Sequence, residues 1–322
     1  MRRLLLVLPF ALAACDREPP ALPPVDVAVH RDSIDLWHNF RRNAIYGRTG
    51  WSTVVGLWWV EPGEITMGSD SSNKIVLPRD RSPGRLGSVH IGQDSTWFVT
   101  ARGATVTLDT MPAPITSARL RSDYEPKATV LRSGSLMIHY IVREDRGVYK
   151  HALRIRDTAS AARMGPQRLR YFPTDIKWRV QARYTPSPKP DSVNIIGVLG
   201  METRMSHEGD LEFMLEGQRR KLMVIREPED HGTNLFLMFT DSTNRTETYP
   251  ATRYVWVTPP DSLGRTIVDF NKAFNPPCAF TKFSTCPFPP KGNHLPFRVE
   301  GGEWNPQYVD RMADSAATKP KD

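Results

Sequence analysis

The sequence has 322 residues and a formal net charge of +8, from 43 lysines and arginines against 35 aspartates and glutamates. Beyond the first residues no segment is apolar enough to cross a bilayer, which excludes a protein with several membrane-spanning helices. The length is ample for a buried core, in one large β domain or in two closely packed smaller ones.

The chain opens with the pattern of a secretory signal. Two arginines precede an apolar run that is about half as long as the roughly 20 residues of a membrane-spanning helix. The run ends in Leu12-Ala13-Ala14-Cys15, which resembles the bacterial lipobox, whose cysteine thiol is acylated. We therefore predict a signal peptide over residues 1–14 and a lipid anchor on Cys15.

The residues that follow predict a tether. Four prolines among the ten residues Asp16 to Val25 favour an extended polyproline II chain. Residues 15–26 thus form a lipidated, proline-rich tether, and the membrane is the expected partner through that anchor. The predicted location is the cell envelope, on the extracytoplasmic side of a membrane and periplasmic in a Gram-negative organism. Nucleic acid is not an expected partner of an exported lipoprotein.

The spacing of apolar residues predicts one helix, over Asp26 to Tyr46. Asp32 or Ser33 is able to cap its start, and Gly47 can end it. We expect this helix to lie across the edge or end of a sheet. The apolar residues recur at three-residue spacing: Ile34, Trp37 and Phe40.

Beyond Gly50 the pattern changes to short apolar or alternating runs separated by turn residues. This pattern predicts antiparallel β meanders in a sandwich or barrel. No alternation of strands with helices is visible, so a doubly wound parallel sheet is not expected. The predicted strands are Ser52–Val60, Ser88–Ile91, Thr96–Thr100, Thr105–Leu108, Leu136–Val142, Val148–Ile155, Lys177–Tyr184, Val193–Leu199, Leu211–Leu215, Lys221–Ile225, Leu235–Phe239 and Tyr254–Val257.

A β-rich globular domain is predicted over residues 27–304. A break near residues 161–171, which contains Met164-Gly165-Pro166, divides it into two β halves. Residues 305–322 are polar and rich in small side chains, which predicts a frayed tail. The region from Arg119 to Arg183 has 15 lysines and arginines against 6 acidic residues. It could face anionic lipid, or its charges could be solvated residues that point outward from strands.

The most specific residues lie near the end, in the run DFNKAFNPPCAFTKFSTCPFPPKGNHLPFRVEGGEW from Asp269 to Trp304. This run resembles the C-terminal signature of a bacterial family known as domain of unknown function 1684. GWSTVVGLWWVEPG at Gly50–Gly63, KIVLP at Lys74–Pro78 and TDSTNRTETYPATRY at Thr240–Tyr254 also resemble this family, as does the stretch from Tyr171 to Val180. His294 departs from the arginine expected there. The resemblance implies kinship and assigns no activity.

Cys278 and Cys286 are the two thiols that remain after lipidation of Cys15. Outside the cytoplasm such a pair predicts a disulfide, which would stabilise so short a loop by about 2.5 kcal/mol. A zinc site with His294 and Glu303 is less favoured because its cysteines are eight residues apart, and no metal is expected. A catalytic cysteine activated by His294 would need a third, orienting group, which the sequence does not reveal.

The same run contains a cluster of polar residues that form the candidate ligand pocket. Prolines beside carboxylates and amides could hold a rigid site for a small polar or glycan ligand. Alternatively, Asp269 and Asn275 satisfy backbone groups in the turn before Pro276. The pocket candidates are Asp269, Asn271, Asn275, His294, Glu303 and Trp304.

Tryptophans offer a second wall for such a ligand. The adjacent Trp58 and Trp59 lie on a predicted strand and therefore face opposite sides of it. Most of the eight tryptophans are expected to fill the core.

The sequence lacks the usual hydrolase, metalloprotease and nucleotide-binding motifs, and no cofactor is expected. We therefore expect a non-catalytic ligand-binding or envelope-structural module. The alternative is an enzyme of unassigned reaction that uses Glu303 or Asp269 as acid or base.

Overall fold

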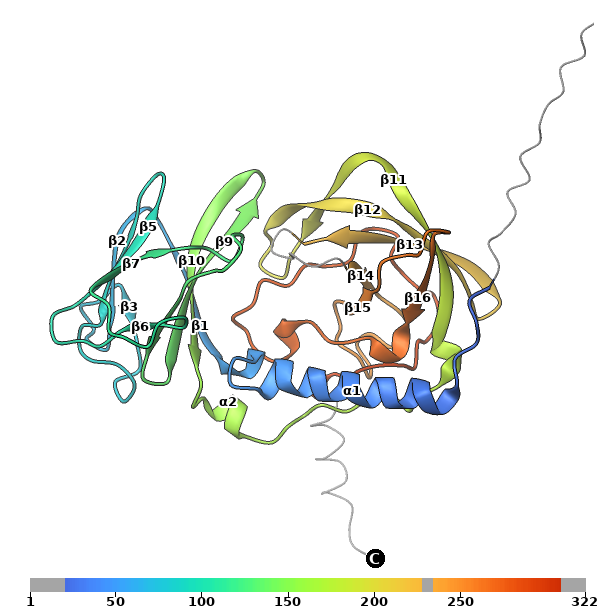
Figure 1. Ribbon diagram of the computed structural model, residues 1–322, viewed down its shortest axis with the longest axis horizontal. Coiled ribbons are helices and arrows are strands. Elements are labelled where there is room, and N and C mark those ends of the chain that lie inside the picture. Colours follow the sequence, from blue (N-terminus) through green and yellow to red (C-terminus); the bar gives the residue numbers. More distant parts are fainter. Residues whose placement is uncertain (1–20, 228–233, 308–322) are drawn as a thin grey trace, which may run out of the picture.

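The computed structural model describes residues 21–227 and 234–307 of the chain. The predicted signal peptide, Cys15 and most of the tail lie outside these residues. The described part is mostly β, in antiparallel sheets with one long N-terminal helix, which confirms the predicted fold class (Figure 1). The short pair β2–β3 is parallel.

Two five-stranded sheets form a sandwich in the N-terminal half. One sheet has the order β1-β10-β9-β8-β6 and the other the order β3-β2-β4-β5-β7. Apolar side chains from both sheets share one core, in which Trp58 packs while Trp59 stays 39% exposed. The strands are β1 (Val54–Val60), β2 (Gly63–Gly68), β3 (Ile75–Val76), β4 (Gly87–Ile91), β5 (Thr96–Thr100), β6 (Thr107–Leu108), β7 (Ser117–Leu120), β8 (Val130–Ser133), β9 (Leu136–Asp145) and β10 (Val148–Asp157).

The C-terminal half is a curled six-stranded sheet of order β15-β14-β13-β12-β11-β16 (Figure 1). Alternate residues of its strands pack on opposite faces, so each face has its own apolar cluster. Leu237 and Val255 belong to one cluster, whereas Phe236 and Tyr254 belong to the other. The strands are β11 (Arg179–Ile196), β12 (Glu202–Leu215), β13 (Gln218–Arg226), β14 (Leu235–Phe239), β15 (Arg253–Val257) and β16 (Arg265–Asp269).

Strand β11 differs from the prediction, because the two strands expected on either side of a proline-rich stretch are one. Its pairing with β12 is irregular between Pro186 and Asp191. Its pairing with β16 ends at Arg183, so the prolines lie where no neighbour on that side needs their missing N–H groups. Proline content therefore signalled a strand irregularity here and not a loop.

Helix α1 (Val27–Tyr46) confirms the predicted helix, but its cap is a different residue. The carboxylate of Asp26 accepts hydrogen bonds from the N–H groups of Ala28 and Val29. The expected alternatives Asp32 and Ser33 lie inside the helix, where the Ser33 hydroxyl donates to the carbonyl of His30. The helix runs along the C-terminal half, beneath the segment that follows β16 (Figure 1).

Short helices complete the fold. The chain passes from β10 to β11 through α2 (Ala161–Met164), which lies in the predicted break at residues 161–171. The others are one-turn 3₁₀ helices: η1 (Trp51–Thr53), η2 (Ile176–Trp178), η3 (Phe270–Lys272) and η4 (Pro277–Ala279). No helix among the described residues is long and apolar enough to cross a membrane.

Candidate functional site

The run from Asp269 to Trp304 is where α1 attaches to the C-terminal half. Asp269 begins η3, and its Oδ1 atom accepts from the backbone N–H of Asn271 at 3.1 Å. Its Oδ2 atom lies 2.8 Å from Nε2 of the buried His30 on α1. The side-chain amide of Asn271 bonds the backbone N–H and carbonyl of Asp175. Both predicted pocket residues thus hold distant segments of the chain together.

Glu303 forms a second, fully buried attachment. Its side chain is 1% exposed and accepts from Nε of Arg41 at 2.5 Å and from an Arg41 Nη2 atom at 3.2 Å. The backbone N–H of Asn275 donates to the same carboxylate at 2.9 Å. The Arg41 guanidinium also lies 4.4 Å from the centre of the Phe274 ring. This pair is a helix clamp, because each charge needs the other to be buried.

The remaining pocket candidates do not complete a site here. The side-chain N–H of Asn275 donates to the carbonyl of Trp304 at 2.8 Å. Trp304 contacts the edge of Phe172. His294 is exposed, and its Nδ1 atom lies 3.0 Å from the hydroxyl of Thr240. Asp269 and Glu303 thus hold α1, whereas His294 lies beside Thr240, and none of the six candidates lines either of the two cavities described below.

Sequence reasoning missed two buried residues that hold this run in place. Asn293 bonds the backbone N–H and carbonyl of Met223 and the carbonyl of Met238. Arg253 pairs with Asp241 at 2.6 Å and donates to the carbonyl of Val299. Arg253 and Asp241 lie in the Thr240–Tyr254 stretch, whose dense polar residues were the available clue.

Cys278 and Cys286 are adjacent in space and are both free thiols in the structure. The predicted disulfide is therefore not formed there and stays a prediction. The backbone N–H of Cys278 donates to Sγ of Cys286 at 3.2 Å, and the Ser284 hydroxyl lies 3.5 Å from the same sulfur. No group of three or more cysteine, histidine or acidic side chains with metal-binding geometry occurs among the described residues.

A cleft of about 360 Å³ lies between the two halves of the protein. The N-terminal half contributes Arg143 on β9 and Arg154 on β10, which point away from the core of the sandwich. The C-terminal half contributes an aromatic wall from β14 and β15, and one edge from the cysteine loop. Besides the two arginines, the cleft is lined by Trp51, Asp123, Glu227, Phe236, Tyr254, Trp256, Phe274, Pro277, Ser284, Thr285, Cys286 and Pro287.

Both arginines of the cleft are held in fixed positions. Arg143 donates to Asp123 at 2.8 Å and to the hydroxyl of Thr285 at 3.1 Å. The guanidinium of Arg154 lies 5.1 Å from the centre of the Trp51 ring. Arg143 and Arg154 are 7% and 6% exposed, so they differ from the solvated strand charges considered above. In the sequence, the only clue to these two arginines was that they occupy positions of β9 and β10 that alternate with the core residues.

The positive charge of this sheet face has an electrostatic consequence for His139 on β9. Burial, followed by the charges of Arg156 and Arg154, lowers the pKa of His139 from 6.5 to about 3. His139 is therefore neutral in the folded protein at neutral pH. The face accordingly owes its charge to guanidinium groups.

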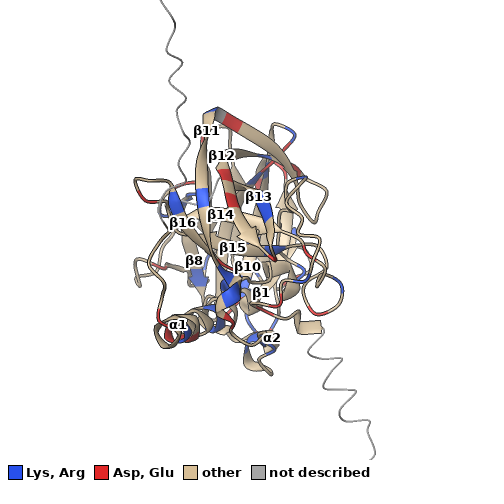
Figure 2. Cartoon of the chain, turned by 90° about the vertical axis from the view of Figure 1, so that its right-hand side faces the viewer, with Lys and Arg blue, Asp and Glu red and all other residues tan. Residues whose placement is uncertain are grey.

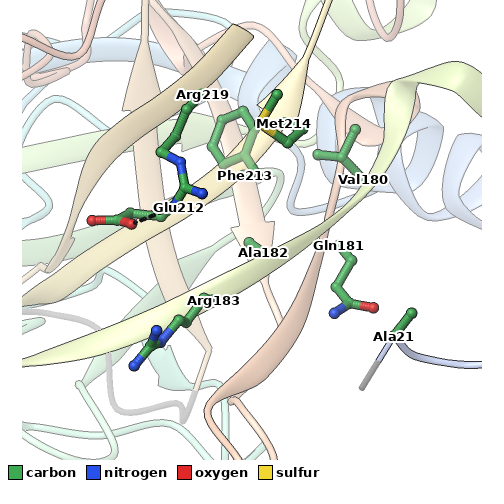
Figure 3. Close-up of a pocket in the computed structure, with 9 residues that line it drawn as sticks. All are labelled: Ala21, Val180, Gln181, Ala182, Arg183, Glu212, Phe213, Met214 and Arg219. Atoms are coloured by element: carbon green, nitrogen blue, oxygen red, sulfur yellow. Dashed lines mark ion pairs between the residues drawn. The ribbon is translucent and has the colours of Figure 1, made fainter. Parts of the chain in front are cut away.

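A second cavity, of about 380 Å³, lies on β11, β12 and β13 of the C-terminal half (Figure 3). Arg183 and Arg219 line it and are exposed, and Arg219 pairs with Glu212 at 3.6 Å. Figure 2 shows both basic and acidic residues on these strands. This cavity lacks the buried charges of the cleft, which makes the cleft the stronger candidate site.

Comparisons with known proteins give kinship only. A family model described as a protein of unknown function (DUF1684) matches residues 167–304. An uncharacterized protein of Haloarcula marismortui, solved by solution NMR, is 34% identical, covers 42% of this chain and 75% of its own, and has a TM-score of 0.36. The FHA-2 domain of a Mycobacterium tuberculosis ABC transporter is 16% identical over 29% of this chain and 76% of its own, with a TM-score of 0.21.

No curated protein matches the chain. The matched residues begin after the N-terminal sandwich, so the resemblance of Gly50–Gly63 and Lys74–Pro78 stays a prediction. The C-terminal signature lies inside the match. The chain belongs to the DUF1684 family of proteins of unknown function.

Proposed function

We propose that this protein is a lipid-anchored, extracytoplasmic binding module that takes a small anionic, ring-bearing molecule into the cleft between its two halves. The observation that supports this most is the meeting of two buried arginines with an aromatic wall at that junction. Junctions between packed units are common sites for small ligands, which need concave, mostly apolar walls and a few fixed polar groups.

The chemistry of the walls favours this class of ligand. A guanidinium shielded from water binds a carboxylate, sulfonate or phosphate strongly, because its planar donors match two oxygens at once. The Phe236 and Trp256 rings also line the cleft, with centroids 4.5 Å apart and planes tilted by 32°, and form an apolar wall. A volume of about 360 Å³ suits a ligand of one or two rings, such as an acidic sugar or an aromatic acid.

The anchor part of the proposal rests on the Leu12–Cys15 sequence and on where the tether ends. The backbone N–H of Leu22 donates to the side chain of Gln181 at 2.5 Å, so the described chain begins against β11. Ala21 is six positions after Cys15 along the chain, which allows a reach of about 20 Å when fully extended. A lipid on Cys15 would therefore hold the C-terminal half close to a membrane.

The cleft is tested with 8-anilinonaphthalene-1-sulfonate (ANS), a fluorescent probe that joins a sulfonate to aromatic rings. We expect saturable binding at one site of the full chain, weakened about tenfold or more in Arg154→Gln, since a charge-assisted hydrogen bond contributes roughly 1.5–3 kcal/mol. Arg219→Gln, in the second cavity, is the matched control and should bind like the wild type. Equal loss in both variants, or no loss in Arg154→Gln, contradicts the proposed site.

The anchor is tested separately, by expressing the full chain in a bacterium that acylates lipoproteins. The wild type should fractionate with membranes, and mass spectrometry should find an acylated Cys15 as the first residue. Cys15→Ser should be released from membranes. An intact, unmodified N-terminus in the cytosol would show that the compartment is wrong, whatever the cleft binds.

A further inference from the structure

Cys278 and Cys286 have surroundings that distinguish one thiol from the other. Cys286 is 4% exposed, and its carbonyl accepts from the N–H of Val198 at 2.9 Å, which fixes it beside the end of β11. Cys278 is only half-buried, in η4. A reagent that approaches from solvent therefore meets Cys278 first.

The hydrogen bonds at the two sulfurs extend this asymmetry. The pKa of the Cys278 thiol is lowered, first by hydrogen bonding with the neighbouring Cys286 and then, against the opposing effect of burial, by Tyr249. Burial raises the pKa of Cys286 well above its ordinary value. The two shifts therefore favour Cys278 over Cys286 as the thiol that ionises first, in the same order as their exposure.

We propose that Cys278 and Cys286 form a reversible dithiol–disulfide couple in the wall of the cleft, with Cys278 as the attacking thiol and Cys286 as the resolving thiol. The oxidant is an external disulfide, either of a small thiol or of a thiol–disulfide oxidoreductase. The Cys278 thiolate attacks one sulfur of that disulfide, forms a mixed disulfide and releases one thiolate. Cys286 then loses its proton and attacks Cys278 Sγ, which forms the internal disulfide and releases the second thiolate.

The contacts on either side of the pair indicate that both oxidation states can be accommodated. In the reduced state the backbone N–H of Cys278 donates to the sulfur of Cys286 at 3.2 Å, so the structure holds the two residues together as free thiols. Prolines before Cys278 and after Cys286 restrict the backbone at each end of the loop. Within the loop from Cys278 to Cys286, the hydroxyl of Thr285 accepts a hydrogen bond from Arg143. The loop is therefore also part of the cleft wall.

The couple is tested on the full chain with Cys15→Ser, which leaves these two cysteines as its only thiols. The protein is equilibrated with mixtures of reduced and oxidised glutathione, quenched with acid and labelled with a maleimide. The number of labels on each chain is then measured by mass spectrometry. We expect only doubly labelled and unlabelled protein, which interconvert fully in both directions as the ratio changes. No oxidised form in excess oxidised glutathione, or a disulfide that excess reduced glutathione fails to open in the folded protein, overturns the proposal.

Single variants test the assigned order of attack. With Cys286→Ser, glutathione should accumulate as a mixed disulfide on Cys278, because the resolving thiol is gone. With Cys278→Ser, the buried Cys286 should stay a free thiol in the same mixture. Thermal unfolding checks that both variants are folded. Faster capture of glutathione by Cys286 than by Cys278 overturns the assignment, and neither readout depends on what the cleft binds.

Discussion

Arg41→Met removes one half of the helix clamp and should destabilise the protein strongly. Glu303 is 1% exposed, and without Arg41 its carboxylate keeps only the N–H of Asn275 as a hydrogen-bond donor in the contacts described above. Removing one partner of a buried ion pair costs about 3–5 kcal/mol because the other charge stays buried. We expect a loss of this size in the free energy of unfolding, measured by urea denaturation.

The double variant Arg41→Met, Glu303→Gln isolates the interaction itself. Glutamine keeps an oxygen for the N–H of Asn275 but bears no charge, so the double variant should lose at least about 1 kcal/mol less than the sum of the single losses. Amide hydrogen exchange in α1 should rise in Arg41→Met, because the clamp attaches that helix to the C-terminal half.

Arg42→Met is the matched control for this experiment. Arg42 is exposed and contacts Asn39 on its own helix at 2.9 Å, so its removal should change the free energy of unfolding by no more than about 0.5 kcal/mol. If Arg41→Met lies within about 1 kcal/mol of the wild type, or if both variants lose the same amount, the structural role assigned to Glu303 is wrong.

Three further predictions follow from buried groups. The pKa of His139 is about 3 in the folded protein and 6.5 in the unfolded chain, so between these pH values only the unfolded chain is protonated there. Acidification over this range should therefore destabilise the protein by up to about 1.4 kcal/mol per pH unit. His139→Gln should flatten that slope in urea titrations at pH 6.5 and 4.5, and an unchanged slope contradicts the assignment. Gly302→Ala should cost at least about 2 kcal/mol more than Gly103→Ala, because both glycines have φ of +81° but only at Gly302 would the new Cβ meet a backbone oxygen, at 2.1 Å. Equal melting temperatures of these two variants would refute the close packing there. Asn293→Ala should cost about 3 kcal/mol in urea, since it leaves three backbone groups, one of them fully buried, without this partner, and a loss below about 1 kcal/mol would count against that role.

Local patterns predicted much of the fold. The alternating run at Thr96–Thr100 and the continuous apolar run at Leu235–Phe239 located β5 and β14 to the residue, because one strand buries alternate side chains and the other buries all of them. The helix was equally visible, whereas its cap was misplaced because several acidic and hydroxyl residues near its start can each accept a backbone N–H. The proline-rich middle of β11 was misread, because proline is compatible with a strand only where pairing is irregular, which a sequence does not show.

The site was harder to predict because its contacts are distant in sequence. Asp269 and Glu303 stood out as unusual polar residues, but their partners His30 and Arg41 precede them by 239 and 262 residues. Their structural role became visible only when α1 was placed. Arg154 looked like any charged strand residue, since its burial depends on how the two halves meet.

Hydrogen–deuterium exchange with and without ANS tests most directly whether the cleft between the halves is a binding site. At saturating probe the account predicts slower exchange in peptides that contain Arg154 and Trp256, with no change in the β12–β13 peptides of the second cavity. Protection confined to β12 and β13, or unchanged exchange in both cleft peptides despite saturable binding, would contradict it.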